Sequence, residues 1–150
     1  MASEILERLF SLKGKTALVT GGYKGIGRAV AETYAEAGAH VAVVARNLLG
    51  CQEAAREIAG KYGVRTVGKS LDVNDSKRVD GVVQEIAGEL GRIDILVNSA
   101  GIPGSEKPVL KMTDADMDEV MNVDFRGTFL VSRAVAQVMV RQKGGKIINV

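Results

Sequence analysis

The sequence predicts an α/β protein with a doubly wound parallel sheet, the Rossmann type of fold, in three layers with helices on both faces. Short apolar, β-rich runs alternate with longer helical runs along the chain. Three of the apolar runs, TALVT, HVAVVA and IDILVN, are nearly continuous, as expected for parallel strands buried on both faces. The short connections between them favour right-handed βαβ units, and 150 residues are about the size of one domain.

The expected elements follow one another in a regular order. Strands are predicted at Thr16–Thr20, Val41–Ala45, Arg65–Ser70, Ile93–Asn98 and Lys146–Val150. Helices are predicted at Gly25–Ala37, Leu48–Tyr62, Asp75–Leu90 and Asp114–Gln142, with a break near Met121 left open. We expect the strand order 3-2-1-4-5 and a fold truncated after the fifth strand, whose edge would be apolar and unguarded.

Glycines and one cap mark the ends of these helices. Gly38, Gly63 and Gly91 each follow a helical run, where a left-handed residue commonly ends a helix. Residues 113–116, TDAD, resemble a capping box at the start of the last helix. Residues 100–111 form the longest irregular stretch and contain both prolines, so we expect a functional loop there.

Composition excludes several classes of protein and site. The net charge is +2 and basic residues form no run, so no nucleic-acid partner is expected. One cysteine, Cys51, and one histidine, His40, exclude an internal disulfide and a Cys or His metal cluster. No apolar run approaches a membrane span, and MASEILERLF lacks the apolar core of a signal peptide. The sequence therefore predicts a cytoplasmic protein with no membrane partner.

Four glycines lie among the eight residues TGGYKGIG, at positions 20–27, between the first strand and the first helix. Glycine permits a tight turn here, lets a pyrophosphate approach bare backbone and allows close packing of helix on strand. The free N–H groups and the dipole of the helix N-terminus favour an anion. A glycine-rich turn without a ligand is the alternative, and the strand–turn–helix context weighs against it.

Three motifs in this order resemble the short-chain dehydrogenase/reductase (SDR) family. They are T-G-x-x-x-G-I-G in the glycine turn, NSAG at 98–101 and NVDFRGTF at 122–129. The resemblance extends from about Leu12 to Val150. It implies an NAD(P)-dependent oxidoreductase that transfers a hydride between nicotinamide and a carbonyl or secondary alcohol. A different doubly wound protein with a similar glycine turn is a weaker alternative.

The resemblance also assigns roles to individual residues. Those expected to bind the cofactor are Gly21, Tyr23, Lys24, Gly25, Ile26, Gly27, Arg46, Asn47, Asp72, Val73, Asn98, Ala100 and Gly101. In the family the three motif glycines line the pyrophosphate. Asp72 is similar to the family's adenine-binding acid, with a carboxylate of a strand-end turn as the alternative. Asn98 belongs to the segment that supports the central strand and faces the ribose.

Of the family's Asn-Ser-Tyr-Lys catalytic tetrad, the resemblance assigns only Asn122, which in the family perturbs its helix. Tyr23, Tyr34 and Tyr62 are not followed by lysine four residues later. We therefore expect the Ser, Tyr and Lys beyond residue 150, and residues 1–150 as the N-terminal NAD(P)-binding Rossmann domain of an enzyme. A non-catalytic dinucleotide-binding module, inactive by itself, is the alternative.

The end of the second strand bears on the choice of cofactor. NAD-binding sites usually place an acidic residue there for the ribose 2′-hydroxyl, but this chain has Ala45 followed by Arg46. A guanidinium binds a 2′-phosphate with charge-assisted hydrogen bonds, and Lys24 adds a second cation. These residues favour NADP(H), with NAD(H) as the alternative. In the opposing interpretation, Lys24 and Arg46 are solvated surface charges.

Residues 117–140 are apolar nearly all round, whereas a helix packed only on a sheet needs one apolar stripe. We expect self-association through this helix, which pairs with its copy in the family, and predict a homotetramer. Covering of the second face by loops of the same chain is the alternative. The substrate is expected to be a small carbonyl or alcohol compound, of sugar/polyol or 3-oxoacyl type.

Overall fold

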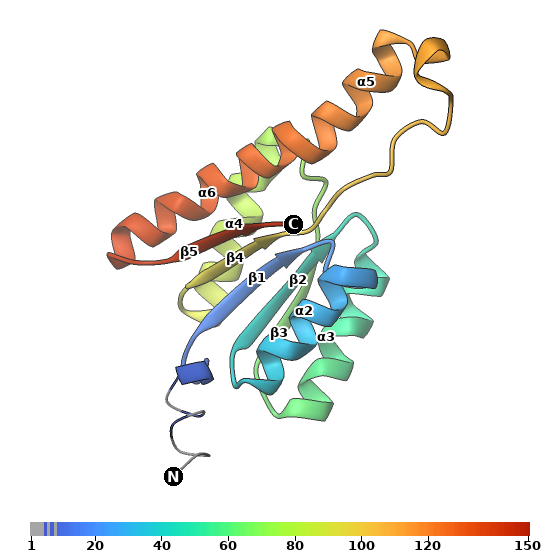
Figure 1. The fold of residues 1–150 in the computed structure, drawn as a ribbon. Coiled ribbons are helices and arrows are strands. Elements are labelled where there is room, and N and C mark those ends of the chain that lie inside the picture. The colour runs from blue at the N-terminus through green and yellow to red at the C-terminus, as the bar shows by residue number, and fades with distance from the viewer. Residues whose placement is uncertain (1–4, 6, 8) are drawn as a thin grey trace.

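The computed structural model describes residue 5, residue 7 and residues 9–150. Its centre is a five-stranded sheet in the order β3-β2-β1-β4-β5, with all neighbours parallel (Figure 1). The strands are β1 (Thr16–Thr20), β2 (His40–Ala45), β3 (Thr66–Ser70), β4 (Ile95–Asn98) and β5 (Lys146–Asn149). The predicted doubly wound parallel sheet and its strand order are confirmed.

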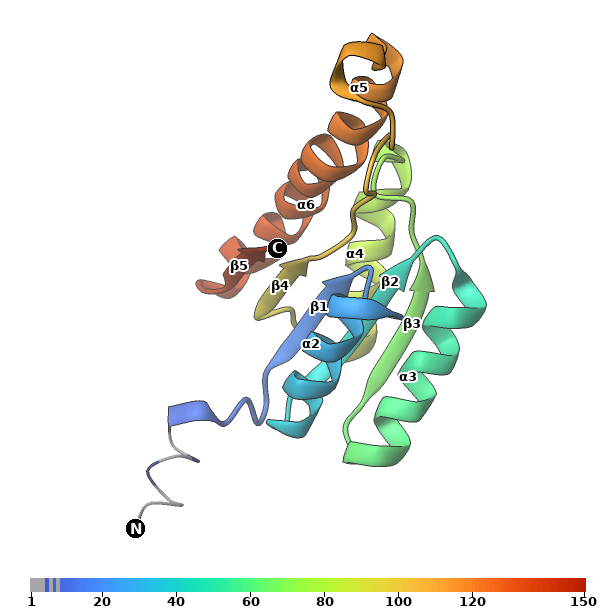
Figure 2. The same cartoon turned by 45° about the vertical axis from the view of Figure 1, so that its right-hand side comes forward.

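Helices cover both faces of the sheet, which gives the predicted three layers (Figures 1 and 2). One face carries α2 (Gly25–Glu36) and α3 (Leu48–Tyr62), and the other carries α4 (Ser76–Leu90) and α6 (Thr128–Gln142). Successive side chains of β1 pack on opposite faces of the sheet, because side chains alternate along a strand. Leu18 packs with residues of α4 and α6, and Val19 packs with residues of α2 and α3.

Most element ends agree with the prediction, and the differences have local causes. Gly63 and Gly91 end α3 and α4 in the left-handed conformation, at φ 68° and 88°. Asp75 precedes α4 rather than starting it, because its carboxylate accepts hydrogen bonds from the backbone of the first turn. The fourth strand is shorter than predicted. Ile93 and Asp94 lie outside it, because its pairing with β1 begins at Ile95.

The predicted helix 114–142 is one continuous helical run of three segments, two α-helical and one π-helical. It consists of α5 (Asp114–Val120), the π-helical segment η2 (Met121–Gly127) and α6. The helix therefore widens at the place where a break was left open. Thr113 and Asp116 form the predicted capping box at the start of α5. The short 3₁₀ helix η1 (Val109–Lys111) and α5 project beyond the sheet (Figures 1 and 2).

The amino-terminal ends of β1 and β4 are joined by polar side chains. Asp94 is buried, accepts a hydrogen bond from Thr16 N at 3.0 Å and pairs with Arg92 at 2.6 Å. The amide of Gln142, at the end of α6, bonds both the N–H and the carbonyl of Ile93, at 3.0 and 2.9 Å. These contacts fix α6 and the two strands at the end of the sheet opposite the predicted site.

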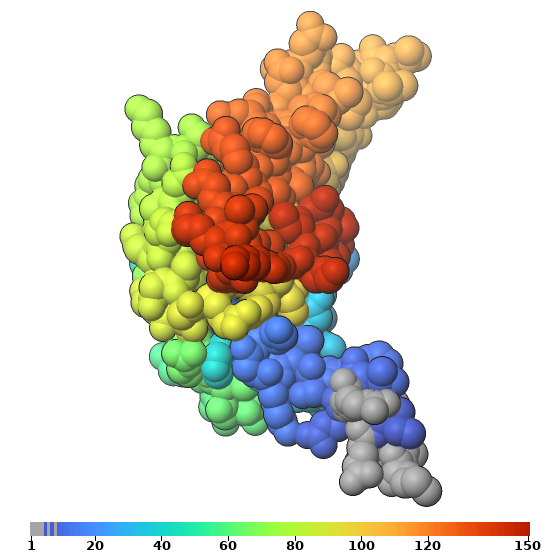
Figure 3. All heavy atoms as spheres, turned by 90° about the vertical axis from the view of Figure 1, so that its left-hand side faces the viewer, coloured from blue at the N-terminus to red at the C-terminus, as the bar shows by residue number. Residues whose placement is uncertain are grey.

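The edge strand β5 lies at the surface beside α6 (Figure 3). Its residues Ile147 and Ile148 are 40% and 41% exposed, as the apolar edge predicted from the sequence requires. In the described part of the chain, no helix is both long and apolar enough to cross a membrane. Part of the N-terminal stretch that we interpreted as lacking a signal peptide lies outside the described residues.

Candidate functional site

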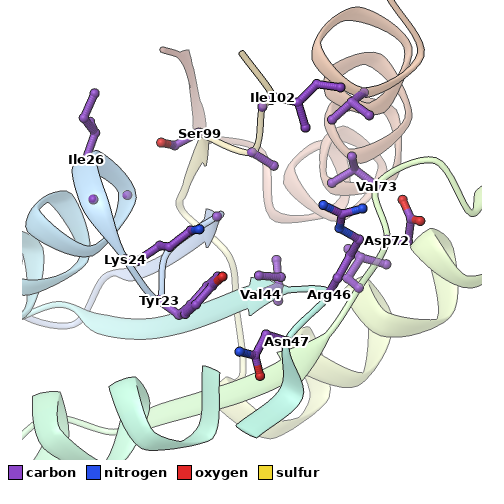
Figure 4. A pocket seen from close by; sticks show the side chains of 18 of the residues that line it. Tyr23, Lys24, Ile26, Val44, Arg46, Asn47, Asp72, Val73, Ser99 and Ile102 are labelled. Atoms are coloured by element: carbon purple, nitrogen blue, oxygen red, sulfur yellow. The ribbon is translucent and has the colours of Figure 1, made fainter. Parts of the chain in front are cut away.

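A cavity of about 620 Å³ opens at the carboxyl ends of the strands (Figure 4), where open α/β sheets bind their ligands. It is lined by Gly21, Tyr23, Lys24, Gly25, Ile26, Gly27, Val44, Ala45, Arg46, Asn47, Leu71, Asp72, Val73, Ser99, Ala100, Gly101, Ile102, Pro103 and Val123. These residues come from the last two positions of β2, the turns that follow the first four strands, the first turn of α2 and η2. The structure thus brings together every predicted cofactor residue except Asn98.

The three glycines of the turn have different physical reasons to be glycine. At Gly21 (φ 65°) a Cβ would lie 2.8 Å from the Ser99 carbonyl oxygen, and at Gly27 it would lie 2.6 Å from that of Gly21. Both positions are therefore closed by neighbouring backbone. Gly25 also has a left-handed φ of 57°, but a Cβ there would meet no atom within 4 Å. Its bare backbone faces open space, as a cradle for a ligand requires.

The N-terminus of α2 points into this site. Its N-cap residue, Lys24, provides no side-chain acceptor for the first-turn amides. Those amides therefore keep N–H groups that can bind an anion. Beside the turn, the Thr20 hydroxyl oxygen accepts hydrogen bonds from Ser99 N and Ala100 N, both at 3.0 Å. This pair of bonds holds the loop after β4 close to the glycine turn.

Two cations line the cavity. Lys24 and Arg46 are exposed, and Figure 4 shows Lys24 beside Tyr23 on one side and Arg46 near Asp72 on the other. Among the described residues, no carboxylate oxygen lies within ion-pairing distance of either cation. The Lys24 Nζ atom lies 5.5 Å from the centre of the Tyr23 ring. The site therefore presents positive charge that is free to meet an anionic ligand.

Asp72 lies in the turn after β3, as the alternative role considered for it requires, and its adenine-binding role stays a prediction. Its exposed carboxylate lines the cavity, and one oxygen accepts a hydrogen bond from Asn74 N at 2.9 Å, which stabilises the turn after β3. Val73 beside it is buried and contributes apolar surface. Behind the site, burial raises the pKa of the Cys51 thiol to about 11. That thiol is therefore protonated at neutral pH and offers no nucleophile.

The family profile described as short chain dehydrogenase matches residues 15–150 of this sequence. The chain belongs to the short-chain dehydrogenase family. The resemblance inferred from the three motifs is thereby confirmed, and the parallel sheet agrees with the solved structures of the family.

Relatives within the SDR family differ in substrate and cofactor. A 3-oxoacyl-[acyl-carrier-protein] reductase from Aquifex aeolicus is 40% identical over 93% of this chain and 56% of its own length. L-Sorbose reductase from Gluconobacter frateurii, solved with NADPH and L-sorbose, has a TM-score of 0.86 and 35% identity, covering 93% of this chain and 53% of that one. NAD⁺-bound xylitol dehydrogenase has a TM-score of 0.87 and 33% identity, and the match covers 91% of this chain and 52% of that one. The chain spans just over half the length of these relatives.

Two predicted site residues lie outside the cavity lining. Asn98 is buried, and its amide donates to Ser132 Oγ and Asn149 Oδ1, both at 2.9 Å. Its side chain therefore joins β4 to α6 and β5 and supports the site from behind. Asn122 lies on η2 and is exposed. Its predicted catalytic role stays a prediction.

Sequence reasoning missed some lining residues. Val44, Leu71, Ser99, Ile102 and Pro103 lie at or just after strand ends, beside motif residues that were assigned. Strand-end position was the signal that would have found them. Val123 comes from η2, more than 20 residues after β4, and its sequence signal was its place beside Asn122 in the motif NVDFRGTF.

Proposed function

We propose that this chain binds NADP(H) in preference to NAD(H) and that the whole protein is a dehydrogenase or reductase. Its substrate would be a carbonyl or secondary alcohol of sugar/polyol or 3-oxoacyl type. The observation that supports the cofactor choice is the pair of cations at the cavity, Lys24 and Arg46, with no carboxylate at Ala45 to oppose a 2′-phosphate. Among the relatives, L-sorbose reductase, xylitol dehydrogenase and a 3-oxoacyl-[acyl-carrier-protein] reductase support these substrate classes.

The residues of the cavity fit such a dinucleotide. The nicotinamide supplies the hydride when the cofactor is bound. The open backbone at Gly25 and the first-turn amides of α2 would hold the pyrophosphate. Arg46 would hold the ribose 2′-phosphate with help from Lys24, and Asp72 the adenine amino group. The family's catalytic Ser, Tyr and Lys would follow residue 150, with Asn122 as the tetrad member in this part.

The size of the preference follows from the two cations. A hydrogen bond to a charged group contributes about 1.5–3 kcal/mol, so two contacts could separate the cofactors by about two to four orders of magnitude. Both side chains are exposed, and solvent screening weakens exposed ion pairs. We therefore expect the lower end, about a 100-fold preference.

The test compares kcat/KM for NADPH and NADH in the whole protein. The double variant Ala45→Asp with Arg46→Ile should reverse or abolish the preference, since it removes a cation and adds an opposing carboxylate. Arg56→Ile is a matched control, because Arg56 is an exposed arginine of α3 that does not line the cavity. A wild-type preference for NADH, or a ratio that the double variant leaves unchanged, would show that this proposal is wrong.

We also propose that the protein is a cytoplasmic homotetramer, associated through residues 117–140. Part of this surface is apolar and exposed: Met117, Met121, Phe125, Phe129 and Val140 are 62%, 45%, 69%, 56% and 76% exposed. The opposite face of α6 is buried on the sheet. The helical run 117–140 thus carries two apolar faces. We propose that the exposed face packs against the same face of a second copy of this chain.

A further inference from the structure

The π-helical segment η2 contacts one wall of the cavity through Asp124. The Asp124 Oδ1 atom accepts a hydrogen bond from Ile102 N at 2.9 Å. A Cβ at Gly101 would lie 3.3 Å from the same oxygen. Gly101 and Ile102 both line the cavity in the loop after β4. Asp124 therefore fixes the position of this loop, although it does not line the cavity itself.

The same segment contacts a second loop of the cavity through Arg126 and Gly127. Arg126 Nη1 donates a hydrogen bond to the Asn74 carbonyl oxygen at 3.1 Å. Gly127 is buried, and a Cβ there would collide with Val73 Cγ2. Val73 lines the cavity in the loop after β3. Three residues of η2 thus contact two loops that approach the cavity from different strands.

The two loops that η2 contacts would hold different parts of the proposed dinucleotide. The loop after β3 carries Asp72 and Val73, where the proposed cofactor places its adenosine half. The loop after β4 follows a strand on the other side of β1 from β2 and β3, and Figure 4 shows its Ser99 and Ile102 between the glycine turn and Val73. The rest of the dinucleotide would extend from its adenosine half toward this loop. A loop held in its binding conformation loses less entropy when the ligand binds.

We propose that η2 is a clamp that positions both loops, with Asp124 acting on the nicotinamide half of the dinucleotide and Arg126 on the adenosine half. Both are positioning residues, since neither lines the cavity. The clamp rests on the proposed dinucleotide function, but it does not depend on whether the cofactor carries a 2′-phosphate. It gives the widened helix a role in ligand binding in addition to any role of Asn122.

The experiment measures affinities of the whole protein for NADPH and for its adenosine-side fragment 2′,5′-ADP. Asp124→Ala should weaken NADPH binding about fivefold, as expected for one hydrogen bond, and leave the fragment unchanged. Asp124→Asn should restore NADPH affinity, because an amide oxygen can accept the bond from Ile102 N. Arg126→Met should weaken both ligands by about the same factor.

A matched control separates positioning from general stability. Arg141 of α6 donates a hydrogen bond to Gln84 Oε1 at 3.1 Å, away from the cavity. Arg141→Met should therefore change neither affinity. The clamp is wrong if Asp124→Ala weakens the fragment as much as NADPH, if Asp124→Asn gives no rescue, or if Arg126→Met behaves as Arg141→Met does.

The outcomes also separate the clamp from the proposed function. A wild-type protein that binds neither NADPH nor NADH would overturn both proposals. A protein that prefers NADH would overturn only the cofactor choice, and the same comparison with NADH and ADP would then test the clamp.

Discussion

The substitution Gly27→Ala tests whether the glycine turn is closed by backbone packing. The added Cβ would lie 2.6 Å from the Gly21 carbonyl oxygen and 2.9 Å from its carbon. Both atoms belong to backbone, so α2 and the turn must move apart. Overpacking of this kind costs about 1–3 kcal/mol, whereas alanine in place of glycine gains up to about 1 kcal/mol in a helix.

Gly81→Ala in α4 is the matched comparison. Gly81 is exposed, and a Cβ there would meet no atom within 4 Å. This variant should gain about 0.5–1 kcal/mol of unfolding free energy. The two variants should therefore differ by about 1–3 kcal/mol, which is the overpacking cost alone.

Urea unfolding of the two variants and titration with NADPH provide the assay. Gly27→Ala should also weaken nucleotide binding, because the turn that moves is the one that faces the ligand, while Gly81→Ala should not. Equal stabilities and equal affinities for the two variants would refute the packing argument.

Three further predictions concern other parts of the molecule. Light scattering at micromolar concentration should show that the wild type is an oligomer. The double variant Phe125→Glu with Phe129→Glu should dissociate it, whereas Leu49→Glu, an exposed control on α3, should not. A monomeric wild type would contradict this prediction. Tyr23→Ala should reduce the preference for NADPH about two- to fivefold, because it removes the ring beside Lys24. Tyr23→Phe should retain the preference. The same ratio of kcat/KM for NADPH to that for NADH in both variants would argue against a role of the ring. Burial, and secondarily Arg65, lowers the pKa of His40 below its ordinary 6.5, so the unfolded chain binds its proton first. The free energy of unfolding should therefore fall as the pH drops below about 6.5, and urea midpoints at about pH 7.5 and about pH 5.5 should show a smaller loss in His40→Gln than in the wild type.

The fold could be predicted because local sequence carries it. Each strand of the centre is an apolar run, and Gly63 and Gly91 mark helix ends with the left-handed conformation that they adopt. The order of the strands then follows from the handedness of βαβ units. Boundaries shifted only where a cap or a ladder decided them, as at Asp75 and Ile95.

The site could be predicted only where a motif lies within a few residues of chain. The glycine turn is such a motif. The separate reasons why Gly21, Gly25 and Gly27 are glycine depend on which atoms face each of them in the folded chain. The contact of Arg126 with Asn74 joins residues 52 apart in sequence, and that of Asn98 with Asn149 joins residues 51 apart. No local pattern announces such pairs, because each partner alone resembles an ordinary polar residue.

The polar lock at the amino-terminal ends of β1 and β4 bears on how this scaffold can diversify. Asp94 and Gln142 hold the strands and α6 together at the end of the sheet opposite the cavity. Substitutions in the loops at the carboxyl ends therefore leave that lock intact. Proteins with this scaffold can therefore change the ligand that they bind through successive loop substitutions, while the sheet stays folded.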